Sequence, residues 1–141
     1  MKTKWMAMAG VAVLVLVLAC GCATTAKGPT DEEIIKANTA GSTAAAKAGD
    51  IDKLLTYYSD KFSHYEFGDK AGFKNFLNGA KDSGYLQGVE VDLSKAQTTI
   101  EGDKATVGPV TVSGGFGSAQ IQFEVVKEAG DWKISGMEMN L

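Results

Sequence analysis

The spacing of apolar side chains divides most of the chain into a helical part and a strand-forming part. Between residues 31 and 80, apolar residues return every three or four positions, which is the period of a helix with one buried face. From residue 89 onward they mostly alternate with polar residues, which is the period of a strand with one buried face. This order predicts an α+β domain in which helices cover one face of a bent antiparallel sheet.

Residue types at the expected helix ends agree with the helical period. Thr30 and Glu33 form a capping box at the start of the first helix, whose apolar face consists mainly of alanine and glycine. Gly49 is expected to end that helix, and Asp50 and Asp69 are expected to cap the second and the third. Because the side chains on that apolar face are so small, another element can pack closely against the first helix.

Turn residues divide the second half of the chain into strands. Gly102-Asp103 predicts a hairpin turn, and residues 113–118 are expected to form a loop between two further strands. Gly108-Pro109 and Gly136 each interrupt the alternation, so we expect a β-bulge or a bend at both positions.

The N-terminal segment has a different character. Lys2 and Lys4 precede an uncharged, apolar stretch over residues 5–19. This is the pattern of a secretory signal, and a stretch of about 15 residues is too short to span a bilayer comfortably. Val17-Leu18-Ala19-Cys20 resembles the bacterial lipobox, in which the cysteine is lipidated and becomes the new N-terminus. Cys22 is the alternative anchor.

These features divide the chain into three segments. Residues 1–19 form a signal peptide (1–21 if Cys22 is the anchor), residues 20–29 a flexible tether, and residues 30–141 the folded domain. As a coil, the tether reaches only about 15–20 Å, which keeps the domain near its membrane. The resemblance implies a lipid anchor in the cell envelope, outside the cytoplasm. Gly21 stands where lipoproteins of the inner membrane carry aspartate, which favours the outer membrane in a cell with two membranes.

Composition limits the partners and the chemistry. Lysine and arginine together number 14, all of them lysine, against 17 acidic residues, for a formal net charge of −3. Because arginine is the side chain that binds phosphate and guanine at two points, we expect no nucleic-acid partner. The chain has one histidine, and its two cysteines lie at residues 20 and 22, so we expect no internal disulfide, no metal site and no cofactor.

Two stretches of the domain are typical of one family. Residues 48–62 (AGDIDKLLTYYSDKF) and residues 125–137 (VVKEAGDWKISGM) resemble NTF2-like domains of the SnoaL or DUF4440 type. The resemblance implies a cone, in which a strongly curved antiparallel sheet wraps around N-terminal helices and encloses a pocket. It also implies a possible homodimer through the outer face of the sheet. Activity does not follow, because the family includes isomerases, cyclases, dehydratases and binding domains.

The resemblance places mainly aromatic side chains around the pocket. The register leaves open whether Tyr57 or Tyr58, and whether His64 or Tyr65, faces it. The alternative interpretation is that these side chains form the hydrophobic core of a small domain. The residues expected at the pocket are Tyr57, Tyr58, Phe62, Tyr65, Phe73, Phe76, Trp132 and Met137.

His64 is the one side chain whose type suits acid–base catalysis near neutral pH. Ketosteroid-isomerase-like relatives place a catalytic carboxylate after the second helix, where this chain has His64 and Glu66. Period-two alternation puts both on one face of an extended segment, as a candidate base and orienting group in proton transfer. Those relatives also use a tyrosine of the first helix, which here offers only small residues such as Thr39 and Ser42. The alternative interpretation is an exposed His64 paired with Glu66.

Three hypotheses about function follow. The first is a membrane-tethered domain that binds a small, largely apolar ligand without defined catalysis. The second is a structural module that dimerises through its sheet within an envelope complex. The third is a SnoaL-like enzyme that uses His64 and Glu66. Because the expected pocket residues include few ionisable groups, the sequence favours the first hypothesis.

Overall fold

Three helices precede a five-stranded antiparallel sheet in the computed structural model of the protein, which describes residues 28–140. The helices are α1 (Asp31–Ala48), α2 (Ile51–Leu55) and α3 (Lys70–Asp82), and a small hairpin of β1 (Ser63–His64) and β2 (Gly68–Asp69) lies between α2 and α3. The sheet consists of β3 (Glu90–Asp92), β4 (Gln97–Glu101), β5 (Lys104–Gly114), β6 (Gly117–Glu128) and β7 (Asp131–Asn140). The predicted α+β class is therefore confirmed.

The helix ends form as the sequence predicts. The Thr30 hydroxyl accepts a hydrogen bond from the Glu33 amide at 3.2 Å, and the Glu33 carboxylate accepts one from the Thr30 amide at 2.7 Å. Gly49 ends α1 in the left-handed conformation, with φ at 67°. The Asp50 and Asp69 carboxylates cap α2 and α3 by accepting hydrogen bonds from backbone amides three residues later. These contacts satisfy amide groups that a helix start otherwise leaves unpaired.

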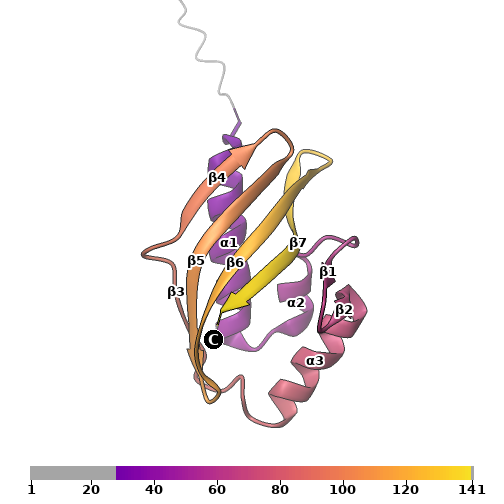
Figure 1. Cartoon of the computed structure of the whole chain (residues 1–141), viewed down its shortest axis with the longest axis vertical. Coiled ribbons are helices and arrows are strands. Elements are labelled where there is room, and N and C mark those ends of the chain that lie inside the picture. Colours follow the sequence, from indigo (N-terminus) through magenta and orange to yellow (C-terminus); the bar gives the residue numbers. More distant parts are fainter. Residues whose placement is uncertain (1–27, 141) are drawn as a thin grey trace, which may run out of the picture.

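Strand β5 organises the sheet. Its first half pairs with β4 and its second half with β3, so β3 and β4 share one edge of β5, while β6 pairs along its whole length and β7 follows β6 (Figure 1). The register shifts between Val107 and Val110, at the predicted Gly108-Pro109 interruption. A second shift leaves Ser135 without an opposite residue, next to the predicted interruption at Gly136. Such bulges bend the strands that carry them.

The prediction of a loop over residues 113–118 is wrong. Strand β5 continues to Gly114 and β6 begins at Gly117, with Ser113 paired to Ser118, so the turn itself is only Gly115 and Phe116. A two-residue connection is the shortest common hairpin turn, and it keeps both strands paired to their ends.

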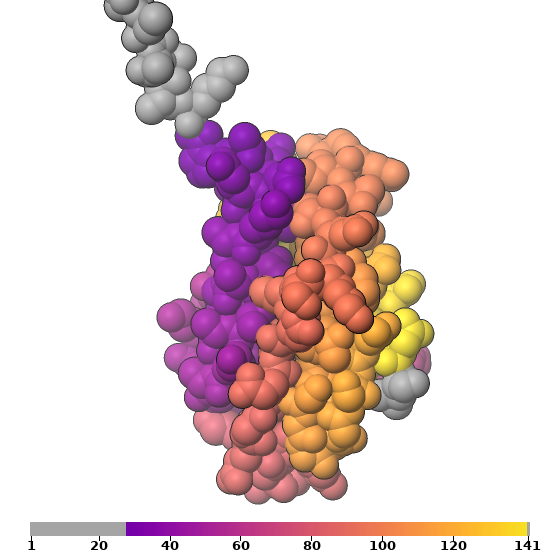
Figure 2. All heavy atoms as spheres, turned by 90° about the vertical axis from the view of Figure 1, so that its left-hand side faces the viewer, coloured from indigo at the N-terminus to yellow at the C-terminus, as the bar shows by residue number. Residues whose placement is uncertain are grey.

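The helices form a second layer on one face of the sheet. Figure 1 shows α1 lying across the sheet, with α2 and α3 toward the end where α1 finishes. From the side, Figure 2 shows α1 packed alongside the β3–β4 segment. Helix α1 contacts β3, β4 and β7, whereas the main contacts of α3 are with α2 and β2. Consequently α3 stands apart from the large sheet.

Polar side chains join the start of α1 to the turn between β6 and β7. The Asp31 carboxylate accepts a hydrogen bond from Trp132 Nε1 at 3.0 Å and pairs with Lys127 at 3.1 Å. The Trp132 hydrogen bond, with a further contribution from Lys127, lowers the pKa of Asp31. Asn38 Nδ2 donates to the Asp131 carboxylate and to the Trp132 carbonyl oxygen, both at 2.8 Å. These bonds hold the buried Trp132 indole beneath α1.

Gly41 allows a close approach to α1, because the Tyr57 ring lies where a β-carbon on Gly41 would stand. We expect Gly41→Ala to lower the free energy of unfolding by about 1–3 kcal/mol, since the ring must move away from the helix. Gly79→Ala in α3 is the matched control, because nothing lies within 4 Å of the added methyl group. It should raise the free energy of unfolding by about 0.5–1 kcal/mol. Urea unfolding measures both, and stabilisation by both substitutions would contradict the close contact.

Candidate functional site

A cavity of about 690 Å³ lies between the helices and the inner face of the sheet. Helix α2 contributes Ile51 and Leu54 to its wall, and α3 contributes Phe73, Phe76 and Leu77. Because side chains alternate along a strand, every second residue of the long strands points inward. The sheet thereby adds Val110, Val112, Ala119, Ile121, Phe123, Met137 and Met139.

The cavity wall carries no formal charge among the residues that the structure describes. It contains no aspartate, glutamate, lysine or histidine, and its polar side chains are Ser42, Thr43, Asn75, Ser83 and two tyrosines. The Ser42 hydroxyl is committed, since it donates to the Thr39 carbonyl oxygen at 2.9 Å. Within residues 28–140, no three His, Cys, Asp or Glu side chains are grouped so that they could hold a metal ion. The chemistry of this wall suits an uncharged ligand.

Three partly exposed aromatic side chains line the cavity and mark its mouth. Phe76 on α3 is 48% exposed, Tyr85 in the turn after α3 is 52% exposed, and Phe116 between β5 and β6 is 44% exposed. In Figure 1 these segments lie at the end of the domain opposite the start of α1. Large exposed apolar side chains beside a cavity are typical of an entrance for a ligand.

The structure brings only part of the predicted pocket set together. Tyr58, Phe73, Phe76 and Met137 all line the cavity. Phe62 and Trp132 do not line it; both are 1% exposed and belong to the hydrophobic core, as the alternative interpretation held.

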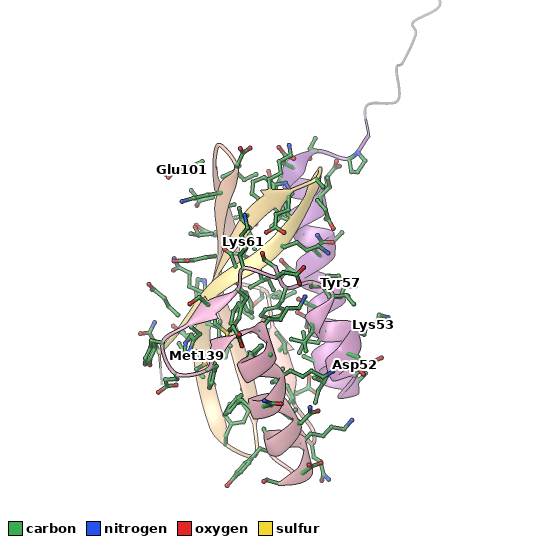
Figure 3. The ribbon with its side chains drawn as sticks, turned by 90° about the vertical axis from the view of Figure 1, so that its right-hand side faces the viewer. Asp52, Lys53, Tyr57, Lys61, Glu101 and Met139 are labelled. Atoms are coloured by element: carbon green, nitrogen blue, oxygen red, sulfur yellow. The ribbon has the colours of Figure 1, made fainter. Side chains whose placement is uncertain are left out.

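Tyr57 and Tyr65 also lie outside the cavity wall. Tyr57 is half-buried and packs against Gly41 of α1. Figure 3 shows Tyr57 on the α1 side of the molecule and Met139 on the sheet side. Tyr65 lies in the turn between β1 and β2 and is 84% exposed, because the strand expected there ends at His64.

The interpretation of His64 as an exposed residue paired with Glu66 is wrong. His64 is 5% exposed, and its Nδ1 accepts a hydrogen bond from the Glu66 backbone amide at 3.1 Å. Its ring lies 4.5 Å from the rings of both Tyr65 and Phe67, while its Nε2 is enclosed without a hydrogen-bond partner. The Glu66 side chain is exposed in the turn, where the alternation no longer holds. Neither residue lines the cavity, so the structure does not form the catalytic pair there.

Several wall residues were not among those predicted. Ile121 and Phe123 could have been predicted, because alternation along β6 puts them on one face and the expected cone turns that face inward. Tyr85 and Phe116 lie in turns, where no periodic pattern indicates which way a side chain points. The lipidation candidates Cys20 and Cys22 lie outside the described residues.

No family model matches the sequence, and no curated protein matches it. Solved structures with the same fold are numerous. The match to Bd1075 of Bdellovibrio bacteriovorus has a TM-score of 0.65 and 17% identity; it covers 75% of this chain but only 40% of that one. A protein of unknown function with a cystatin-like fold from Nostoc punctiforme has a TM-score of 0.64 and 18% identity, covering 77% of this chain and 89% of that chain.

A third similar structure is an NTF2-like protein of unknown function from Pseudomonas putida. Its TM-score is 0.64 and its identity 14%, and the match covers 78% of this chain and 84% of that chain. At such identities the similarity establishes the fold and not the activity. The predicted NTF2-like cone, with its helices packed on an antiparallel sheet, is thereby confirmed.

If His64 has a purely structural role, His64→Phe should leave both stability and ligand binding nearly unchanged. The phenyl ring keeps the stacking on Phe67 and removes the unpartnered Nε2, at the loss of one hydrogen bond from the Glu66 amide. We therefore expect the free energy of unfolding to change by less than about 1 kcal/mol. Urea unfolding measures the stability, and the fluorescence of bound N-phenyl-1-naphthylamine measures ligand binding. A loss of binding in a folded variant would return His64 to the functional site.

Proposed function

We propose that the protein is a lipid-anchored envelope lipoprotein whose NTF2-like domain binds a small, uncharged, largely apolar molecule. The observation that carries this proposal is the 690 Å³ cavity with its charge-free wall and aromatic mouth. Its size falls within the range of about 300–1,000 Å³ that is usual for small-molecule sites. Burying apolar surface there is favourable by roughly 25 cal/mol per Å².

The nature of the wall argues for binding rather than acid–base catalysis. A charged ligand would lose its water without gaining an opposite charge, which is strongly unfavourable. Proton transfer needs a base within hydrogen-bonding reach of the substrate, and the described wall offers no carboxylate or imidazole. A ligand held by shape and apolar contact is the function that this cavity supports best.

A homodimer through the outer face of the sheet stays a prediction. That face carries Thr106, Thr111, Gln120 and Gln122, whose side chains alternate with the inward apolar set. An association through it would rest on hydrogen bonds more than on apolar burial.

The proposal of a lipid anchor rests on the lipobox-like segment before Cys20 and on the end of the domain at which α1 begins. The described chain enters α1 at the end opposite the cavity mouth (Figure 1). No helix within the described residues is long and apolar enough to cross a bilayer. A short tether would therefore hold the start of α1 near the membrane and turn the mouth away from it.

Binding can be tested on a fragment of residues 24–141, since every cap, core residue and hydrogen bond described above lies within it. N-phenyl-1-naphthylamine, a neutral apolar dye, should bind saturably with one molecule per chain and fluoresce more strongly. Ile121→Trp should weaken this binding by about tenfold or more, because the indole fills the cavity from β6. Gln120→Trp is the matched control on the opposite face and should bind as the wild type does. If the wild type does not bind the dye, or both variants bind equally, the proposal fails.

Lipidation can be tested on the full chain by labelling bacterial cells with an alkyne-bearing fatty acid. Cys20→Ser should abolish the label and the membrane association of the protein, whereas Cys22→Ser should retain both. The opposite pattern would move the anchor to Cys22. If the wild-type protein takes up no label, the lipid anchor is removed from the proposal.

A further inference from the structure

We propose that the Tyr58 hydroxyl is the hydrogen-bond donor of the cavity, and that the ligand therefore carries an acceptor oxygen, such as a carbonyl, on an otherwise apolar body. This inference rests on the proposed binding function and names the chemical class of the ligand. It begins from the one polar side chain of the wall that is nine-tenths buried and has no partner among the described residues.

The position of Tyr58 is fixed by its backbone and by its ring. On either side of it, the Ser59 amide donates to the Ile134 carbonyl oxygen at 2.8 Å, and the Ile134 amide donates to the Tyr57 carbonyl oxygen at 2.9 Å. The Tyr58 ring lies 5.2 Å from the Phe62 ring and 5.3 Å from the Phe73 ring. A hydroxyl held in this way is preorganised, so little side-chain entropy is lost when it binds a ligand.

The hydroxyl itself is free to bind. No hydrogen bond joins it to another described residue, although Tyr58 is only 5% exposed. Among the described residues, His64 Nε2 is the only fully enclosed side-chain nitrogen or oxygen atom without a hydrogen-bond partner, so the unpartnered Tyr58 hydroxyl oxygen keeps some accessible surface. The cavity is the space that Tyr58 borders. Burial also raises the pKa of Tyr58, so this hydroxyl stays a donor even above the pH at which an exposed tyrosine ionises.

The other polar groups of the wall cannot take this role equally well. The Ser42 hydroxyl already donates to a backbone carbonyl oxygen. Asn75, Ser83 and Tyr85 are exposed, so water competes for their hydrogen bonds, and Thr43 is only half-buried. A ligand acceptor is thus bound most selectively at Tyr58, with the apolar body directed along the wall toward the mouth.

The protein should discriminate between two ligands of similar shape when only one of them carries an acceptor oxygen. A pure hydrocarbon would leave the buried hydroxyl unpaired, and an unpaired buried donor is unfavourable. Benzophenone and diphenylmethane form a suitable pair, because they differ mainly in a carbonyl group that accepts but cannot donate. Each is titrated against bound N-phenyl-1-naphthylamine in the fragment of residues 24–141, and the quantity of interest is the ratio of the two dissociation constants.

Tyr58→Phe should shift this ratio against benzophenone by about threefold to tenfold, the usual effect of one hydrogen bond, while diphenylmethane binds as before or more tightly. Tyr57→Phe is the matched control, because it deletes a hydroxyl beside α1 and outside the cavity wall, and it should not change the ratio. Tyr85→Phe deletes the hydroxyl at the mouth and tests whether the donor lies there instead. In the wild type, the infrared carbonyl stretch of bound benzophenone should lie at lower frequency than in an apolar solvent, and the shift should vanish in Tyr58→Phe.

The possible failures can be distinguished. If neither compound displaces the dye and the dye itself does not bind, the proposed function fails. If both compounds bind but Tyr58→Phe leaves the ratio unchanged, or the bound wild-type carbonyl stretch is that of a free ketone, the inference about Tyr58 is overturned while binding stands. An equal loss in Tyr85→Phe would place the donor at the mouth and overturn it as well. The infrared measurement on the wild type decides the matter even if Tyr58→Phe does not fold.

Discussion

The pairing of residues 57–59 with Ile134 of β7 is the constraint on which the site depends. The two backbone hydrogen bonds to Ile134 follow directly after α2 and tie the chain to the edge of the sheet. They place the Tyr58 ring in the cavity wall and set where the β1–β2 hairpin begins. Since α3 makes its main contacts with α2 and β2, its position relative to the large sheet follows from the same pairing.

Curvature supplies the other half of the cavity. The bulge near Gly108-Pro109 and the unpaired Ser135 lie on β5 and β7, the strands on either side of β6. Bulges increase local bend and twist, so a sheet that carries them can wrap around the helices instead of lying flat against them. With α3 held by α2 and β2, a curved sheet leaves a space that side chains line but do not fill.

Local signals could be predicted from the sequence, and contacts between distant segments could not. The caps at Thr30, Asp50 and Asp69 depend on three or four neighbouring residues, so their residue types suffice. Whether Trp132 faces a pocket or the core depends on Asp31, about a hundred positions away, which accepts its indole hydrogen bond. His64 shows the same limit, because its burial comes from a hairpin so short that Phe67 folds back onto its ring. The cavity-wall residues on β6 are an intermediate case. Alternation along the strand shows that they share a face, but only the fold shows that this face borders a cavity.

The cavity of about 690 Å³ is open at its mouth, and this determines what can fill it. Solvent enters such a space whenever no ligand is bound, and it meets a wall that is mostly apolar. The space therefore holds water or a ligand. Water needs two to four polar partners at each site, and the deep wall offers little beyond the Tyr58 hydroxyl. Poorly bound water is readily displaced by apolar surface, so the same wall that makes the unliganded cavity unfavourable favours an apolar guest.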